Sequence, residues 1–482
     1  MKYRRRAGGI LLAAALLMAG ATGCQPSDAP PTITASRALF PVFSTDITDY
    51  VNRCYSGSST TITVDTPAGT EVSVAGSAPR SGKFSVAVPQ FVGRRFIITV
   101  TKDLRTTSHS VRCLPSDFPR WAVTRTRAPQ AEFYATLPFA FPNPGSYPTI
   151  YDDHGVPIWW GPKTNGLNAT YLPDGNLAWS RNNGFEEHRF DGSLVRTYST
   201  VGAPADFHEL LVLPNGNHVM ATAQDRPNTD LSSWGGPANA TIVNHVIQEI
   251  NPAGQVVWSW DTFSHIPVSE TTRYWQLQQL ANPGGPFSPS YDPYHFNSVA
   301  PSGDGYVVSF RHLDAVYQIR RSTGAIGWKF GGSLRVESLA PVDDVVAGGG
   351  VFAGQHDARM LSDGTLTVFD DGTGRRAPRA VAYRLDLTRR RATLLDQITD
   401  PVQTVAGCCG SARLTPRGNY VIAWGDGGTK PADFTEATPA GTRIFSIRFP
   451  TAISYRVEPI PFNTINRDVL RQGMDAQYPV QP

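Results

Sequence analysis

Leu172-Pro-Asp-Gly-Asn176 is a short segment that recurs along the chain, and its recurrence decides the fold. It returns as Leu213-Pro-Asn-Gly-Asn217 and Thr415-Pro-Arg-Gly-Asn419, with looser copies at 300–304 and 361–365. Pro and Gly at these positions are typical of a tight turn between two antiparallel strands. Because a β-type run follows every copy, each copy predicts a hairpin.

A second unit follows the first in the same order. It consists of a glycine turn and then an apolar strand that often ends in tryptophan, as in His154-Gly155 to Trp159 and Ser322-Thr-Gly324 to Trp328. Together the two units predict four antiparallel strands per repeat, most clearly at 295–300, 306–311, 316–320 and 325–329. Four-stranded repeats of variable length are typical of β-propeller blades.

The repeats predict an all-β protein: a six-bladed β-propeller at 119–482, preceded by a small N-terminal β-sandwich at 37–115. Polar and apolar residues alternate in the N-terminal stretch. A plain array of sandwiches is the alternative architecture. We expect five blades along the chain and a sixth at 119–160 that the C-terminal tail helps to close; the five lie at 167–198, 208–261, 295–329, 356–397 and 410–458.

Composition agrees with many short strands joined by turns. Of 482 residues, 44 are Gly and 39 are Pro, and 40% are hydrophobic. The net charge of +3 owes four positive charges to the first six residues; without these, 39 basic residues face 40 acidic ones. No basic stripe therefore points to nucleic acid as a partner.

The N-terminus predicts export. A basic start and a short apolar run are typical of a signal peptide, here 1–23, and 24–36 reads as a Pro/Ser-rich tether. Small residues before Cys24 resemble a bacterial lipobox, so we expect either a lipid anchor at Cys24 outside the cytoplasmic membrane or plain secretion. An oxidising compartment would let Cys54 and Cys113 pair. For the adjacent cysteines at 408–409 the sequence leaves a disulfide and free thiols both open.

Three histidines occupy one position of the repeat. His208, His295 and His356 each stand six residues before the turn proline or its equivalent, at the start of the first strand of a blade. The first strand of a blade lines the central channel, so these side chains are expected to meet at one mouth. A single histidine is usually structural, but three in the same position favour a site.

Arg311 and Asn297 extend this candidate site. Asn297 lies two residues after His295 on one strand, and Arg311 ends the next strand, which returns to the same mouth. A guanidinium with imidazole and amide donors suits an anion with several oxygens, such as sulfate or phosphate. The structural alternative is that Arg311 pairs with an acid such as Asp314.

These segments resemble the arylsulfotransferase family of bacterial envelope proteins over roughly 150–460. The resemblance is strongest in four motifs: Asp292-Pro-Tyr-His295-Phe-Asn297, Val308-Ser-Phe-Arg311-His, Ile326-Gly-Trp328-Lys-Phe-Gly-Gly332 and Gln355-His356-Asp-Ala-Arg359. It implies a six-bladed propeller that moves a sulfuryl group from a phenolic sulfate ester to a phenolic acceptor, without a nucleotide sulfate donor and without a cofactor or metal.

The resemblance also implies residue roles. His356 would be the nucleophile, sulfated in a ping-pong cycle, and His208, His295, Asn297 and Arg311 would bind the sulfuryl group. A neutral imidazole is a good nucleophile near neutral pH, which suits this role. Known members carry a spaced disulfide near the active site, whereas the nearest candidate here is the adjacent cysteine pair.

Two other functions stay open from the sequence. Three imidazoles have the right number for a catalytic zinc, although an arginine at the same mouth disfavours a cation. Alternatively, the chain is a non-catalytic surface propeller that binds glycan or protein through exposed aromatic residues in the long segments 225–240 and 262–294; the candidates are Trp234, Trp275, Tyr291 and Tyr294. The oligomeric state is not predicted.

Overall fold

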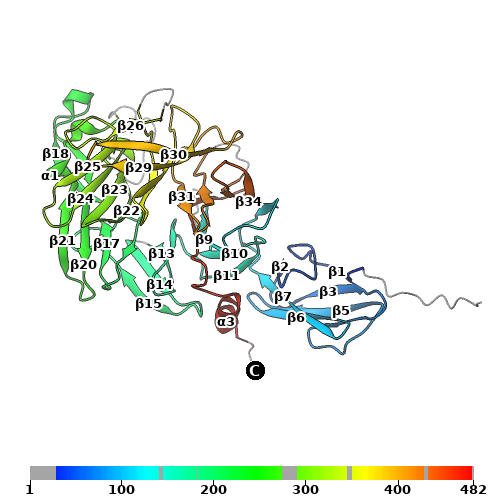
Figure 1. Cartoon of the computed structure of the whole chain (residues 1–482). Coiled ribbons are helices and arrows are strands. Elements are labelled where there is room, and N and C mark those ends of the chain that lie inside the picture. Colours follow the sequence, from blue (N-terminus) through cyan, green and yellow to red (C-terminus); the bar gives the residue numbers. More distant parts are fainter. Residues whose placement is uncertain are drawn as a thin grey trace, which may run out of the picture.

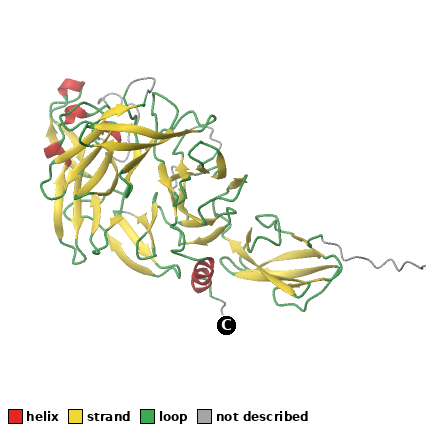
Figure 2. Cartoon of the chain, viewed as in Figure 1, coloured by secondary structure: helices red, strands yellow, loops and turns green. Residues whose placement is uncertain are grey.

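The computed structural model describes residues 29–140, 145–181, 183–273, 290–344, 350–427 and 432–479. Nearly all of its regular structure is β (Figure 2). Figure 1 shows a smaller group of strands at one end, followed by a larger body. The predicted signal peptide and the first part of the predicted tether, with Cys24, lie outside the described residues. Within them, no helix is long and apolar enough to cross a bilayer.

The smaller group consists of two sheets that share one apolar core. Strand β3 shows why they pack, since Ile62 and Val64 are buried while the residues between them are exposed. The disulfide between Cys54 and Cys113 is present, as predicted, with the Cα atoms 5.6 Å apart. The sheets are β1 (Thr32–Ala35), β3 (Ser58–Asp65) and β5 (Lys83–Gln90), and β2 (Asp49–Arg53), β7 (Arg105–Leu114), β6 (Arg95–Lys102) and β4 (Thr70–Val74).

Among the described residues, the larger body contains six sheets of four or five strands. The predicted turns form, and Gly175 and Gly216 adopt the positive φ that favours glycine there. Three sheets follow the predicted repeats: β12 (Ala169–Tyr171), β13 (Leu177–Arg181), β14 (Gly184–His188) and β15 (Leu194–Tyr198); β16 (Leu211–Val212), β17 (His218–Ala221), β20 (Val246–Ile250) and β21 (Val256–Asp261); and β22 (Phe296–Ser302), β23 (Gly305–Phe310), β24 (Ala315–Arg320) and β25 (Ile326–Gly331).

The fourth sheet contains five strands. Strand β26 (Ala340–Val342) pairs in parallel with β30 at its outer edge. The other strands follow in chain order: β27 (His356–Met360), β28 (Thr365–Asp370), β29 (Arg379–Asp386) and β30 (Arg391–Thr399).

The last two sheets exchange strands between distant parts of the chain. An early strand, β8 (Ala122–Arg125), pairs with β34, and a late strand, β35 (Ile453–Pro459), pairs with β9. The assignment of 410–458 to one blade is therefore wrong at its end, because β35 belongs to the neighbouring sheet. The strands are β31 (Ser411–Leu414), β32 (Tyr420–Ala423), β33 (Phe434–Ala437) and β34 (Arg443–Arg448), and β9 (Phe133–Phe139), β10 (Thr149–Asp152) and β11 (Pro157–Trp160).

The long segments differ from expectation. Part of 225–240 is not loop, because β18 (Gln224–Thr229) and β19 (Ala240–Asn244) form a hairpin, and α1 (Thr262–His265) follows β21. Tyr291 and Tyr294 are 1% and 0% exposed, so they cannot be surface contacts as the glycan-binding alternative requires. Trp234 is half-buried, and Trp275 lies outside the described residues.

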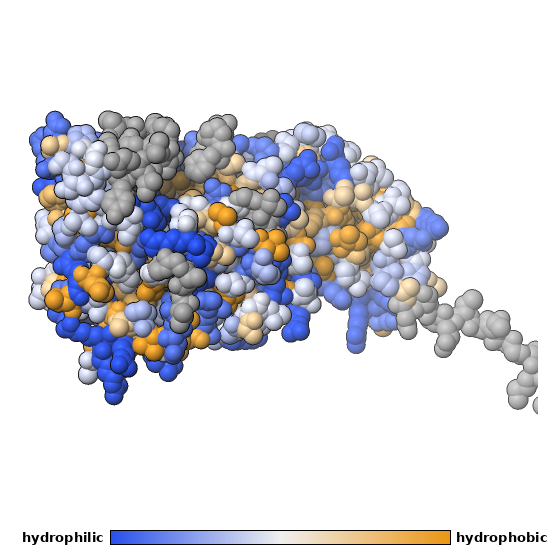
Figure 3. Space-filling model, turned by 90° about the horizontal axis from the view of Figure 1, so that it is seen from above, coloured by the Kyte–Doolittle hydropathy of each residue, from blue (hydrophilic) through white to orange (hydrophobic). Residues whose placement is uncertain are grey.

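Helix α3 (Arg467–Gln477) joins the smaller group of sheets to the larger body. Asn466 caps it by accepting a hydrogen bond from the Val469 N–H. On one side Asp475 binds Arg112 of β7, and Arg471 binds Asp49 of β2. The repeats gave no signal for this helix. Figure 3 shows hydrophobic groups on the surface separated by hydrophilic ones.

Candidate active site

The three histidines come together at the starts of neighbouring strands. His208 and His295 precede β16 and β22, and His356 begins β27. The ring centroids of His208 and His295 are 5.2 Å apart. Tyr455 of β35 lies beside both His208 and His356, with ring centroids 5.5 and 5.9 Å away. The spacing from the turns therefore places these side chains in one cluster.

The His356 ring has a defined orientation. Its Nδ1 lies 3.0 Å from the Gly354 carbonyl oxygen and 3.1 Å from Asp371 Oδ1, so Nδ1 carries the proton. The lone pair is on Nε2, which accepts a 3.3 Å hydrogen bond from the Cys409 N–H. Burial lowers the pKa of His356 well below its ordinary value, and the nearby Arg311 guanidinium acts in the same direction. A lowered pKa favours the uncharged imidazole, with its lone pair on Nε2, near neutral pH.

Arg311 lies against the same carboxylate as His356. Its Nε is 4.0 Å from Asp371 Oδ2, while its two terminal nitrogens reach His312 Nε2 at 2.9 Å and the Gly407 carbonyl oxygen at 2.6 Å. Burial raises the pKa of Asp371 well above its ordinary value, although the Arg311 guanidinium opposes this. Asp371 can thus accept a proton more readily than an exposed carboxylate.

Asp314 is not the partner of Arg311. It binds Arg273 and Arg375 at 3.2 and 3.1 Å and accepts a hydrogen bond from the Gly354 N–H. The structural alternative for Arg311 is therefore wrong in its choice of acid. Asp314 instead fixes the backbone that leads into His356.

Asn297 is fully buried beside the His356 strand. Its Nδ2 donates to the Gln355 carbonyl oxygen at 2.8 Å, and its backbone oxygen accepts from Arg456. Among the described residues, its Oδ1 has no hydrogen-bond partner. The side chain therefore supports the backbone next to His356, and its oxygen is left for another donor.

Each of the other two histidines is held by an aspartate. Asp206 Oδ1 binds His208 Nδ1 at 2.5 Å, and Asp292 Oδ2 binds His295 Nδ1 at 2.6 Å. Both rings therefore carry the proton on Nδ1 and leave Nε2 free to accept or, when charged, to donate. Burial lowers the pKa of His295, against the effect of Asp292.

His245 lies between these two aspartates. Its Nδ1 donates to the Thr222 carbonyl oxygen and is 3.8 Å from Asp206 Oδ2, and its Nε2 is 3.7 Å from Asp292 Oδ1. Burial lowers its pKa, but the two carboxylates outweigh this effect and raise the value above the ordinary one. The two carboxylates thus favour the protonated form of His245, and the pKa values of Asp206 and Asp292 are both lowered by the histidines around them.

The metal alternative receives little support from this arrangement. In the described part of the chain, Asp292, His295 and His312 present ligand atoms within 4.8 Å of one another, but His208 and His356 do not belong to that group. His208, His295 and His356 therefore do not form the expected three-imidazole set. The Arg311 guanidinium, which binds His312 Nε2, further disfavours a metal cation at that group.

A layer of paired charges lies directly behind the histidines. It uses the residues that follow them in the chain: Glu209 after His208 and Asp357 after His356. Arg456 binds both of these acids, at 3.0 and 3.1 Å, and all three are buried. This layer separates the cluster from the other end of the strands.

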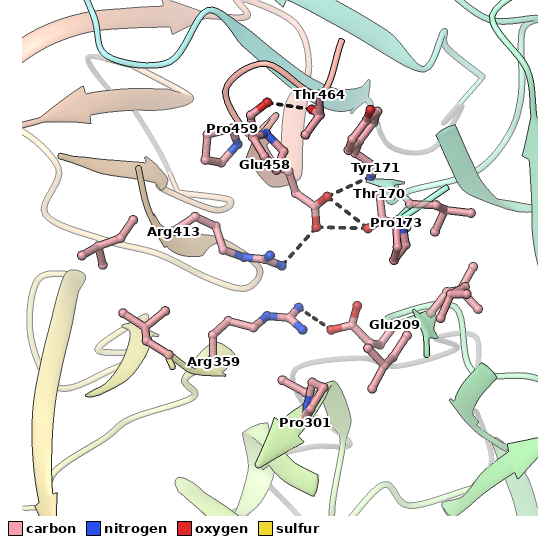
Figure 4. A pocket seen from close by; sticks show the side chains of 18 of the residues that line it. Thr170, Tyr171, Pro173, Glu209, Pro301, Arg359, Arg413, Glu458, Pro459 and Thr464 are labelled. Carbon is pink, nitrogen blue, oxygen red and sulfur yellow. Dashed lines mark hydrogen bonds and ion pairs between the residues drawn. The ribbon is translucent and has the colours of Figure 1, made fainter. Parts of the chain in front are cut away.

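A pocket of about 760 Å³ lies on that other side. Figure 4 shows Arg359 facing Glu209 and Arg413 facing Glu458 across it, with the turns at Pro173 and Pro301 among its walls. All four charged side chains are paired, and none of the three histidines lines the pocket. This hollow is thus separate from the reactive groups.

Sequence reasoning missed the residues that orient the histidines. Asp371, Asp206, Asp292, His245 and Tyr455 all contact or adjoin the cluster. An acid two or three residues before a histidine in the repeated position, as in Asp206-Phe-His208, was a usable signal. The adjacent Cys408 and Cys409 form a disulfide, which settles the pairing left open above.

Comparison with known proteins supports one family. A family model described as Arylsulfotransferase (ASST) matches residues 178–449. No curated protein matches significantly. Similar solved structures include a putative 6-phosphogluconolactonase from Bacteroides fragilis, with 10% identity, 81% of this chain and 98% of that one covered, and a TM-score of 0.33. Another is a periplasmic gluconolactonase from Pseudomonas aeruginosa, with 14% identity, 68% and 100% covered, and a TM-score of 0.36.

Proposed function

The chain belongs to the arylsulfotransferase family, and from this premise we propose that it moves a sulfuryl group from a phenolic sulfate ester to a phenolic acceptor through a sulfated His356. One observation carries the proposal: His356 Nε2 holds a lone pair, Nδ1 is fixed by Asp371, and the Arg311 guanidinium lies against the same Asp371 carboxylate. No nucleotide sulfate donor takes part.

The reaction has two balanced halves. In the first, the His356 Nε2 lone pair forms a bond to sulfur while the bond from sulfur to the aryl oxygen breaks, and the phenolate leaves with the electron pair. In the second, the acceptor phenolate forms a bond to sulfur, and the N–S electron pair returns to Nε2. The low pKa of His356 keeps the lone pair available in the first half.

The other residues have electrostatic roles. Arg311 would bind the sulfuryl oxygens as charge spreads over them, and Asn297 would hold the Gln355 backbone in place. His208 and His295 would join Arg311 through Nε2–H when their rings carry a second proton, since Nδ1 of each is already bound to an aspartate. Sulfation gives the ring a positive charge while Nδ1 keeps its proton. Asp371 faces that proton, and its carboxylate would stabilise the charge, which in turn would favour the ionised form of this buried acid.

We also infer an architecture and a location. The six sheets of the larger body would be blades of one propeller over 119–482, closed by β8 and β35, and the two sheets at 37–115 would be a sandwich. The family and the signal peptide predicted at 1–23 suit an exported protein. A lipid on Cys24 would tie it to the membrane, with small aryl sulfates and phenols as its reaction partners.

The test uses the exported domain with p-nitrophenyl sulfate and a panel of phenols. We expect nitrophenol release that depends on the acceptor, and one sulfuryl group on a His356 peptide when the acceptor is left out. His356→Ala should release none. His218→Ala is a matched control, because His218 is buried on β17 and its ring binds the Ser199 carbonyl oxygen, away from the cluster. Equal release by wild type and His356→Ala, across the panel, would refute the proposal.

A further inference from the structure

The loop 407–409 touches both reactive groups of the site through its backbone. The Gly407 carbonyl oxygen accepts from Arg311, and the Cys409 N–H donates to His356 Nε2 at 3.3 Å. The Cys408 carbonyl oxygen is held in turn by the Asp426 N–H at 2.9 Å. A single turn of chain thus fixes the guanidinium and contacts the reacting nitrogen.

The orientation of the Cys409 amide depends on an unusual backbone. Cys409 has a φ of +74°, in the left-handed region that favours glycine and costs other residues about 1–2 kcal/mol. It is crosslinked to Cys408 and is 5% exposed. Gly425 allows the close approach from the next strand, since a Cβ there would stand 2.2 Å from the Cys408 carbonyl oxygen. Crosslink and packing together hold the amide toward His356.

We propose that the Cys409 backbone N–H is a catalytic donor that binds a sulfuryl oxygen during transfer, and that the Cys408–Cys409 disulfide holds it in position. This inference rests on the proposed function. In the resting site the N–H donates to the Nε2 lone pair. When that pair forms the N–S bond and the aryl oxygen leaves with its electrons, the N–H loses its acceptor, and the nearest new one is an oxygen on the attached sulfur.

A backbone amide suits this exchange for a physical reason. It is neutral and keeps its proton at every step, so it serves the uncharged imidazole and the anionic sulfuryl group equally. In the second half the N–S pair returns to Nε2, and the N–H returns to it. A single such donor aimed at developing charge is typically worth about 100-fold or more in rate.

The experiment distinguishes the effect of the Cys409 amide orientation from the effect of the sulfur atoms themselves. Cys408→Ser/Cys409→Gly lacks the crosslink but accepts the positive φ, whereas Cys408→Ser/Cys409→Ala lacks the crosslink and disfavours it. We expect both variants to sulfate His356 more slowly than wild type. The single-turnover rate constant of the Gly variant should be about tenfold higher than that of the Ala variant, whereas KM for the donor should be similar in the two. Equal rates for the two variants would overturn the inference.

A second measurement guards against misfolding. In a Cys54→Ala/Cys113→Ala background, a phosphine reductant should slow sulfation when Cys408 and Cys409 are both present. The same reductant should leave the rate unchanged when Cys408→Ser/Cys409→Gly is added to that background, because no disulfide is then left to reduce. If the reductant does not slow sulfation in Cys54→Ala/Cys113→Ala protein that keeps Cys408 and Cys409, the inference is also overturned. The proposed function fails separately, if wild type never carries a sulfuryl group on His356.

Discussion

Replacing Asp371 with asparagine tests the proposed sulfation of His356, because Asp371 would stabilise the charge that this sulfation creates. Asp371 Oδ1 is 3.1 Å from His356 Nδ1, and the side chain is fully buried. Asn has the same size and keeps an oxygen that can accept from Nδ1, so Asp371→Asn removes the charge and little else. The neutral ring of the resting enzyme loses little by this change, but the sulfated ring loses its counter-charge.

The magnitude follows from the kind of hydrogen bond that is weakened. Bonds to a charged group contribute about 1.5–3 kcal/mol in proteins. If that energy is present in the transition state and absent in the resting enzyme, its loss slows the step about 10- to 150-fold. Because the charge develops only after the donor is bound, KM should change little.

The assay is a single turnover of p-nitrophenyl sulfate followed by stopped-flow absorbance. Glu187→Gln is a matched control, since Glu187 is also a fully buried carboxylate but lies on β14, where it binds Tyr198 and Asn176. We expect the control to sulfate at close to the wild-type rate. A wild-type rate in Asp371→Asn, or a loss that lies entirely in KM, would refute the role given to Asp371.

Further predictions concern the cation, the pH dependence and the N-terminal disulfide. Arg311→Lys should lower kcat/KM for the donor about 100-fold, because one ammonium group cannot replace a planar guanidinium whose two terminal nitrogens bind two different partners. Retention of most activity would contradict this. Since the pKa of His356 is lowered well below its ordinary value, the sulfation rate should stay level as pH falls from 8 to about 6.5, and a decline centred there would show an ordinary histidine. Cys54→Ala/Cys113→Ala should lower the free energy of unfolding by about 2–4 kcal/mol in urea titrations, with sulfation retained.

The sequence predicted the histidine cluster because the turns set the register. A fixed distance from each turn places His208, His295 and His356 at the same height on neighbouring strands, and no knowledge of distant pairing is needed. The strands at 295–329 followed from the same regularity, and β22–β25 confirm them.

Other parts of the site depend on contacts that no local pattern encodes. Tyr455 reaches the cluster because β35 pairs with β9, more than 300 residues earlier. Asp371 follows the end of β28, where the repeat no longer predicts which way a side chain points. His295 has a positive φ, at +55°, so simple alternation along β22 could not tell where its side chain points.

The exchange of strands between the last two sheets also orders events in time. Strand β8 is made early but pairs only with β34, so its sheet needs the chain as far as residue 448. Strand β9 also pairs with β35, so its sheet needs the chain as far as residue 459. Contacts of such sequence separation form slowly. The histidine cluster therefore meets Tyr455 only after β35 has been made. The last strand of the chain thus completes both the sheet of β9 and the surroundings of His208 and His356.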